Sequence, residues 1–261
     1  MAFRSMEQAH IARFNSAVSS NFLNDYEKFV SDKLVANSAR TPHKTFAPSS
    51  FRCNRRSWFR IRGVQPDSVK VPDLRLDFTA QVGTACHETI QKNLKEMLGN
   101  DWIDVNTYLR SIDYPYEYTI DHDVSNLETR ITIQRPPLTF SCDGLLKRNN
   151  EYYLLEIKTA EFSTWDNLTD VKEEHIDQIK CYATLLQLEK ALVVYQDRQY
   201  GGFKCYEIKI SPLDKEDILN RFEYVLDMVD KNLAPDGLPQ GDKWCSPSMC
   251  PYYKKCQEYG R

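Results

Sequence analysis

The chain has 261 residues, of which 41% are hydrophobic and 27% charged, and its formal net charge is −3. This length and composition predict one large globular domain, or one domain with an appendage. No apolar run approaches the roughly 18 residues that a membrane helix needs, and the opening MAFRSMEQAH is polar, so we expect neither a membrane span nor a secretory signal. Eight cysteines then favour free thiols or a metal site over disulfides, and we expect a cytoplasmic enzyme.

The N-terminal region predicts helices that stand apart from the rest. Residues 5–36 carry apolar side chains at helical spacing, which indicates one or two amphipathic helices that form core or docking surface. The polar residues 37–50 include two prolines and predict a connection. We therefore expect a helical extension over residues 1–49 and a main domain over residues 50–261.

A basic and aromatic segment, FRCNRRSWFRIRG, begins the main domain. No acidic residue occurs between Lys44 and Pro66, so the segment is locally positive although the whole chain is acidic. Guanidinium groups grip phosphates and aromatic faces stack on unpaired bases, which favours a nucleic-acid contact. The alternative is an amphipathic helix with its aromatics in the core and its arginines in water. The residues that we expect to contact nucleic acid are Arg52, Arg55, Arg56, Trp58 and Arg60.

The next predicted helix carries a histidine at the edge of its apolar face. Gly83 and Thr84 suit its start and Leu98 its end. His87 lies one step off the expected buried stripe of this helix, where a histidine is usually a satisfied core residue. It becomes a ligand candidate only if the helix packs over the hairpin described next. The stripe consists of Cys86, Ile90, Leu94 and Met97.

A hairpin with paired carboxylates is predicted at the centre of the chain. Strand-like runs at residues 138–147 and 152–158 flank a short polar turn. Alternation brings Asp143, Glu156 and Lys158 toward one end of this hairpin. Two carboxylates suit a hard divalent cation, and a lysine beside them can position water or phosphate. The alternative is three solvated charges on an ordinary hairpin.

The remaining elements complete an α/β pattern with a mixed sheet. One predicted helix places Gln178 and Tyr182, four residues apart, on the same flank. The predicted strands lie at residues 116–122, 128–134, 191–196 and 204–210, and the predicted helices at residues 175–186 and 213–233.

The tail contains three cysteines spaced C-x4-C-x5-C, namely Cys245, Cys250 and Cys256. Closely spaced thiolates in a cytoplasmic chain indicate a metal ion or a cluster. Three ligands leave a tetrahedral site one short, and Cys53 is the best fourth. The other cysteines fall inside predicted elements, where a cysteine acts as a small hydrophobe: Cys86, Cys142, Cys181 and Cys205.

The order of these motifs resembles the RecB-type branch of the PD-(D/E)XK nuclease superfamily. The resemblance covers roughly residues 50–258, and its cysteines resemble those of the iron–sulfur members, which include the AddB nuclease domain, CRISPR-associated RecB-like exonucleases and stand-alone phage nucleases. Cys142 stands where the superfamily name has proline, and the cysteine trio has x4 where many relatives have x2. No G-x-x-x-x-G-K-[ST] motif occurs, so these residues contain no helicase motor. The matching pieces are His87 in G-T-A-C-H, Asp143 in C-D-G, Glu156-Ile157-Lys158-Thr159, and Gln178-x-x-x-Tyr182.

The resemblance implies a restriction-endonuclease-like core: a mixed central sheet flanked by helices, with a cysteine-rich tail over residues 240–261. Asp143 and Glu156 would hold Mg²⁺ or Mn²⁺, and Lys158 would orient and help deprotonate the attacking water. His87 would add a nitrogen ligand, which suits Mn²⁺. The further implied groups are the backbone carbonyl of Ile157 as a metal ligand, and Gln178 and Tyr182 as residues that line the site or hold the DNA strand.

The resemblance also implies that Cys53, Cys245, Cys250 and Cys256 hold a structural [4Fe–4S] cluster, with Zn²⁺ as the alternative. We expect a metal-dependent DNA exonuclease that acts on single-stranded ends in replication, recombination or repair. Two alternatives remain: a nuclease of the same fold in CRISPR spacer acquisition with protein partners, and a catalytically idle nucleic-acid-binding module with a zinc staple. Cleavage polarity and oligomeric state are left open.

Overall fold

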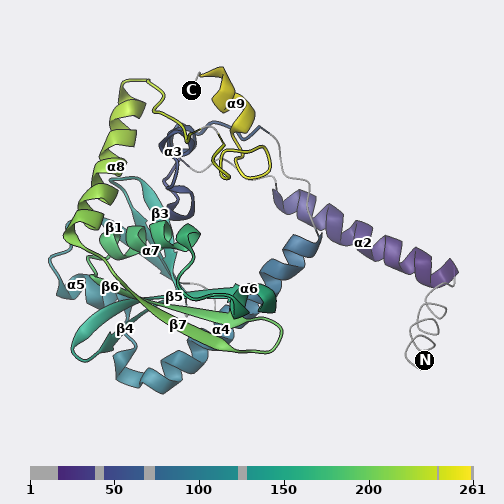
Figure 1. Cartoon of the computed structure of the whole chain (residues 1–261), viewed down its shortest axis with the longest axis horizontal. Coiled ribbons are helices and arrows are strands. Elements are labelled where there is room, and N and C mark those ends of the chain that lie inside the picture. The colour runs from purple at the N-terminus through teal and green to yellow at the C-terminus, as the bar shows by residue number, and fades with distance from the viewer. Residues whose placement is uncertain (1–16, 39–43, 68–73, 123–127, 240, 260–261) are drawn as a thin grey trace. The chain divides into compact units, whose positions relative to one another are not determined.

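The structure, a computed structural model, describes residues 17–38, 44–67, 74–122, 128–239 and 241–259, with only the backbone at residues 17–20, 37–38 and 50 (Figure 1). The chain forms two compact units, which we describe separately. One comprises residues 1–41 and 68–81, and the other residues 42–67 and 82–261.

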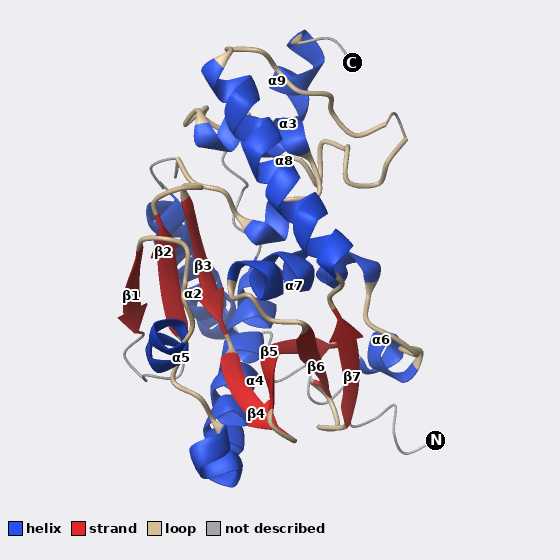
Figure 2. Cartoon of the chain, turned by 90° about the vertical axis from the view of Figure 1, so that its left-hand side faces the viewer, coloured by secondary structure: helices blue, strands red, loops and turns tan. Residues whose placement is uncertain are grey.

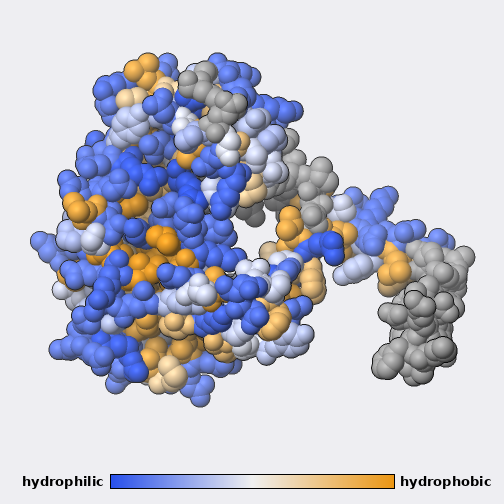
Figure 3. Space-filling model, viewed as in Figure 1, coloured by the Kyte–Doolittle hydropathy of each residue, from blue (hydrophilic) through white to orange (hydrophobic). Residues whose placement is uncertain are grey.

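The first unit contains helix α2 (Ala17–Ser38) and the first turns of α4 (Leu74–Leu98). The apolar side chains expected to form a core or docking stripe on α2 are exposed: Phe22 is 68% and Phe29 66% exposed. Figure 3 shows apolar patches along this helix. The part of the predicted helices before residue 17 lies outside the described residues.

The second unit begins earlier than the predicted boundary at residue 49. Phe46 is fully buried, its backbone N–H donates to the carbonyl of Pro137, and it forms a β-bridge with Leu138. Residues 42–49 therefore belong with the main unit and not with the helical extension.

Two sheets form the centre of this unit (Figure 2). The first is antiparallel, in the order β1 (Tyr118–His122), β2 (Thr129–Ile133), β3 (Leu138–Cys142). The second has the order β4 (Gly144–Arg148), β5 (Glu151–Ala160), β6 (Lys190–Asp197), β7 (Phe203–Lys209). Strands β5 and β6 are parallel and the other pairs antiparallel, so this sheet is mixed, as the sequence predicts.

The first strand of the predicted hairpin is in fact two strands. Residues 138–142 pair with β2, residues 144–148 pair with β5, and Asp143 lies at the point where the chain passes from one sheet to the other. The turn to β5 is tight because Asn149 and Asn150 have φ of 49° and 68°, which asparagine tolerates. The alternation argument therefore fails at Asp143, since it assumed one continuous strand.

Helices cover both faces of β5, which is buried from Tyr153 to Ile157. Ile157 packs in a cluster with Ile90 of α4, whereas Leu154 belongs to the large core with Ile179 of α7. Side chains alternate along a strand, so Glu156 and Lys158 face the same side as Leu154. The remaining helices are η1 (Pro48–Ser50), α3 (Asn54–Ile61), η2 (Gly99–Asp101), α5 (Val105–Ser111), α6 (Phe162–Asp166), α7 (Glu173–Leu185), α8 (Pro212–Asp230) and α9 (Tyr253–Glu258).

Helix α4 differs from its prediction in its first residue and in which of its side chains are buried. It begins at Leu74, so Gly83 lies inside it, where an added Cβ would lie 3.4 Å from the Thr159 hydroxyl oxygen on β5. The stripe is buried at Ile90 and partly buried at Leu94, but Met97 is 69% exposed, and Leu98 packs against the Ile90 cluster instead. Within the described residues, no helix is long and apolar enough to cross a membrane.

Candidate metal-dependent active site and cysteine pocket

Asp143 is fixed at the junction of the two sheets. Its Oδ2 accepts the backbone N–H of Ile157 at 2.7 Å, and its carbonyl accepts the side chain of Gln91 at 2.7 Å. The next residue must be glycine, because a Cβ at Gly144 would lie 2.7 Å from the Trp102 ring. Only 9% of Asp143 is exposed, so its carboxylate is held beside β5 in one orientation.

Glu156 and Lys158 form the centre of the site. The Nζ of Lys158 lies 2.5 Å from Glu156 Oε1 and 3.3 Å from Gln178 Oε1. Burial raises the pKa of Glu156, and the Asp143 carboxylate raises it further, while Lys158 and His87 oppose the shift. Two carboxylates in a poorly solvated place carry more negative charge than one lysine offsets, and a divalent cation would neutralise it.

We expected His87 to be a ligand candidate only if its helix packs over the hairpin, and the structure meets this condition. Helix α4 packs on the sheet, and His87 Nδ1 lies 3.7 Å from Asp143 Oδ1. The side chain of His87 is 29% exposed, so the imidazole is not enclosed in the hydrophobic core. The structure thus brings His87 beside the carboxylates.

Gln178 and Tyr182 act on Lys158 from α7. Gln178 accepts from Lys158 and donates to the Tyr182 hydroxyl at 3.0 Å. Tyr182 is 8% exposed and stacks on Phe140, so its packing favours the first of its two expected roles, lining the site, over holding a DNA strand. Its hydroxyl fixes the amide of Gln178, which in turn orients the lysine.

Gln91 is a site residue that the motif reading missed. It is 3% exposed and donates to the backbone of Asp143. It lies four residues after His87, so both side chains occupy one face of α4. A polar residue one turn after His87 on the packed face is the signal that was available.

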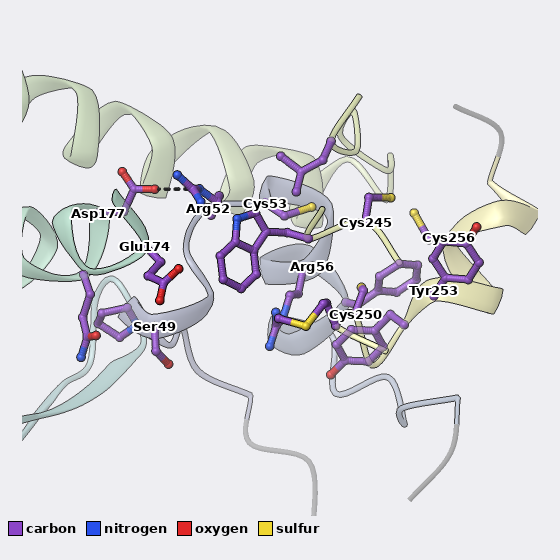
Figure 4. Close-up of a pocket in the computed structure, with 17 residues that line it drawn as sticks. Ser49, Arg52, Cys53, Arg56, Glu174, Asp177, Cys245, Cys250, Tyr253 and Cys256 are labelled. Atoms are coloured by element: carbon purple, nitrogen blue, oxygen red, sulfur yellow. Dashed lines mark ion pairs between the residues drawn. The ribbon is translucent and has the colours of Figure 1, made fainter. Parts of the chain in front are cut away.

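The four cysteines expected to share a ligand line one pocket of about 240 Å³ (Figure 4). Cys53 is the N-cap of α3, Cys256 lies in α9, and Cys245 and Cys250 come from the loop before α9. Burial raises the pKa of the Cys250 thiol; Arg56 opposes this, while Cys53 and Cys256 add to it, so the thiols are near neighbours.

As the side chains lie, no three His, Cys, Asp or Glu residues of the described chain form a ready metal centre. Both donor sets nevertheless fit the groups expected of them. The buried pair Asp143 and Glu156 presents carboxylate oxygens, which suit Mg²⁺ or Mn²⁺. The cysteine pocket presents four sulfurs, which suit iron–sulfur or zinc ligation.

The basic segment divides into buried and pocket-facing residues, which corrects part of its prediction. Trp58 is fully buried and Arg55 is 3% exposed, with its Nε donating to the Pro235 carbonyl at 2.6 Å. Arg60 donates to the Thr45 carbonyl at 2.7 Å. The expectation that Trp58 and Arg55 contact nucleic acid is wrong, because their packing and hydrogen bonds hold the segment in the core.

Arg52 and Arg56 are the arginines of the segment that line the cysteine pocket. Arg52 Nη2 lies 2.8 Å from Glu173 and its Nε 3.3 Å from Asp177, which ties the segment to α7. Trp244 and Gln178 also line this pocket. It therefore reaches the residue that orients Lys158.

No family model and no curated protein matches this chain. A solved structure known as the crystal structure of SSO0001 aligns with 91% of this chain and 98% of its own, at 19% identity and a TM-score of 0.48. These values are too low to carry an argument about activity.

Proposed function

We propose that the chain is a metal-dependent deoxyribonuclease of the RecB-like PD-(D/E)XK branch, with a restriction-endonuclease-like core, that degrades DNA from single-stranded ends. One observation carries this proposal. Lys158 is held between Glu156 and Gln178 while Asp143 is fixed against the backbone of Ile157. Residues from α4, the β3–β4 junction, β5 and α7 thus meet in the motif order of that branch.

The chemistry divides among named residues. Asp143 and Glu156 would hold Mg²⁺ or Mn²⁺, with His87 and the carbonyl of Ile157 as further ligands, and the ion would supply positive charge to the attacked phosphate. Lys158 orients a water and helps to remove its proton. The water oxygen bonds to phosphorus and its proton passes to bulk water, while the bond to the leaving sugar oxygen breaks and that oxygen takes a proton from bulk water.

Single-stranded DNA is the substrate that the surroundings favour. The cysteine pocket presents Arg56 and the rings of Trp244 and Tyr253, and it reaches Gln178 beside the site. Cations beside aromatic faces suit an unpaired strand, whose phosphates and bases are both accessible. The cysteines would hold a [4Fe–4S] cluster, or Zn²⁺ in its place, as a structural centre.

The test is cleavage of end-labelled single- and double-stranded oligonucleotides with Mg²⁺ or Mn²⁺. The wild type should shorten single strands, and Asp143→Ala, Glu156→Ala and Lys158→Ala should each abolish cleavage while circular dichroism stays unchanged. Losses in one catalytic unit should not add in double variants. Near-normal cleavage by any two single variants would refute this site, and DNA binding without cleavage by the wild type would favour the idle binding module.

A further inference from the structure

Helix α7 carries one more polar residue on the face that meets the site. His175, Gln178 and Tyr182 are three and four residues apart, so they lie along one stripe of the helix. Gln178 and Tyr182 act on Lys158. His175, in the first turn of α7, is the third member of this stripe, and its contacts are described next.

Strand register places Tyr195, the residue that His175 contacts, beside Lys158. In the parallel β5–β6 pair, Lys158 is the partner of Tyr195, and paired residues point to the same face. Tyr195 is 1% exposed, and its hydroxyl lies 2.6 Å from His175 Nδ1. His175 and Gln178 thus contact two neighbouring side chains, Tyr195 and Lys158.

The hydrogen bonds of Tyr195 leave its hydroxyl hydrogen available to the imidazole. The Tyr195 oxygen accepts the backbone N–H of Lys172 at 3.2 Å, and its own hydrogen is free to donate to Nδ1. Burial lowers the pKa of His175 to about 4, and Lys158 and Lys172 lower it in the same direction. The ring is therefore neutral near pH 7, and when Nδ1 accepts the Tyr195 hydroxyl hydrogen the ring hydrogen lies on Nε2, which is the tautomer that we infer.

The Nε2–H of His175 is left as a donor toward solvent. Among the described residues it makes no hydrogen bond, yet it is not enclosed. The residues whose buried side-chain nitrogen or oxygen atoms lack a partner are others: Asn54, Thr184, Gln196 and Trp244.

Lys172 supplies a cation that acts on His175. Its side chain is 31% exposed, and its Nζ lies 3.9 Å from Glu174, which offsets its charge only in part. Lys172 and Lys158 both act electrostatically on His175, so the donor lies within the field of two ammonium groups. A fixed N–H donor in such a field suits an oxyanion.

We propose that the His175 Nε2–H and the Lys172 ammonium form a phosphate subsite beside Lys158, which holds the DNA backbone phosphate next to the one that is cleaved. This inference rests on the proposed nuclease function. His175 would grip the strand through a phosphate oxygen and take no part in proton transfer. Tyr195 is its positioning residue, because its hydroxyl selects the tautomer that can donate.

The experiment measures binding of single-stranded oligonucleotides that carry one neutral methylphosphonate at successive positions, in Ca²⁺ without cleavage. For the wild type, the methylphosphonate at one linkage should reduce affinity about tenfold relative to the unmodified oligonucleotide. That factor is the effect of losing one charge-assisted hydrogen bond. In His175→Ala and Lys172→Ala, unmodified DNA should bind more weakly and the penalty at that linkage should shrink. His122→Ala and Lys209→Ala, at exposed positions on the edge strands, are the matched controls and should keep the full penalty.

Nitrogen-15 NMR of the histidine rings gives a readout that needs no DNA. The signals absent in His175→Ala should belong to a neutral ring with hydrogen on Nε2, and Tyr195→Phe should mix the two tautomers. An unchanged methylphosphonate profile in His175→Ala, or a hydrogen on Nδ1, would overturn the subsite. A normal profile in a protein that never cleaves DNA would retain the subsite and reject the nuclease, whereas no DNA binding at all would reject both.

Discussion

At the scale of single residues, Glu156 carries the largest electrostatic cost of the site. Glu156 is 3% exposed and lies 2.5 Å from the Lys158 ammonium, while the Asp143 carboxylate raises the pKa of Glu156 beyond the effect of burial. A buried carboxylate with incomplete compensation destabilises a fold, and such groups persist where they bind or react. The charge is therefore evidence for a cation site that is independent of the motif.

The pKa of Glu156 leads to a stability prediction for the metal-free protein. A carboxylate whose pKa is raised on folding contributes its stability below the unfolded pKa of about 4.3 and loses it as pH rises through the folded pKa. Between pH 5 and 8 the wild type should thus lose free energy of unfolding relative to Glu156→Gln, on the order of 1–3 kcal/mol. Urea unfolding in EDTA measures this difference, and added Mn²⁺ should reverse it.

Glu151→Gln is the control for that experiment. Glu151 is exposed and its bond to Lys190 lowers its pKa, so its effect on stability should be flat between pH 5 and 8. Parallel pH profiles for the wild type and Glu156→Gln would contradict a raised pKa at position 156.

At the scale of elements, α3 shows how one helix divides its arginines. Arg55 is buried and its guanidinium donates to Pro235 and Cys256, whereas Arg56 faces the cysteine pocket. Neighbouring residues on a helix point about 100° apart, so adjacent arginines can have opposite roles. One secures the C-terminal segment, and the other is available to a ligand.

This division predicts different outcomes for two adjacent substitutions. Arg55→Ala should lower the free energy of unfolding by about 2–3 kcal/mol, because it leaves buried carbonyls without a charged donor. Arg56→Ala should change stability little, but it should weaken DNA binding. The slope of log binding constant against log salt concentration should become shallower by about one, the effect of one lost phosphate contact. Thermal unfolding and salt-dependent binding measure the two effects; an unchanged salt slope in Arg56→Ala would place that arginine away from DNA.

The elements also show what local pattern can and cannot predict. Strands β1, β2, β6 and β7 and helices α7 and α8 lie where the sequence predicts them, because alternation and helical periodicity are local properties. The break at Asp143 escaped prediction because it depends on which distant strand each half pairs with. The exposure of Met97 and the burial of Arg55 escaped for the same reason, since neighbours from elsewhere in the chain decide which face is covered.

The candidate site was more predictable than the strands that carry it. Its residue types and order identified Asp143, Glu156 and Lys158, and the structure brings these together with His87 and Gln178. The motif identified the polar groups of the site but not the residues that hold them in place, such as Gln91, which donates to the Asp143 carbonyl. Supporting contacts depend on three-dimensional packing, so no spacing rule finds them.

At the scale of the whole second unit, contacts that do not involve the cysteines join the C-terminal segment to residues 59–67. Tyr252 stacks on Phe59 at 5.2 Å, and the carboxylate of Asp67 accepts the backbone N–H groups of Lys254 and Lys255. The tail therefore has its own attachment to the α3 region, and a metal at the cysteines would reinforce a contact that already exists. Bridging Cys53 to Cys245 closes a loop of about 190 residues, for which the chain-entropy model gives at most about 5 kcal/mol.

The last prediction concerns that centre. Anaerobically purified protein should be brown and contain iron if the four cysteines hold [4Fe–4S], and colourless and contain zinc if they hold Zn²⁺. In either case Cys250→Ser should lower metal content, thermal stability and DNA binding together, because the tail and Arg56 would lose a shared anchor. Cys205→Ser, at an exposed position on β7, is the matched control and should change none of these. The stability loss should stay below the full cross-link value, since Tyr252 and Asp67 still hold the tail. If Cys53→Ser leaves metal content and stability unchanged, Cys53 is not the fourth ligand, even though it lines the same pocket as the other three.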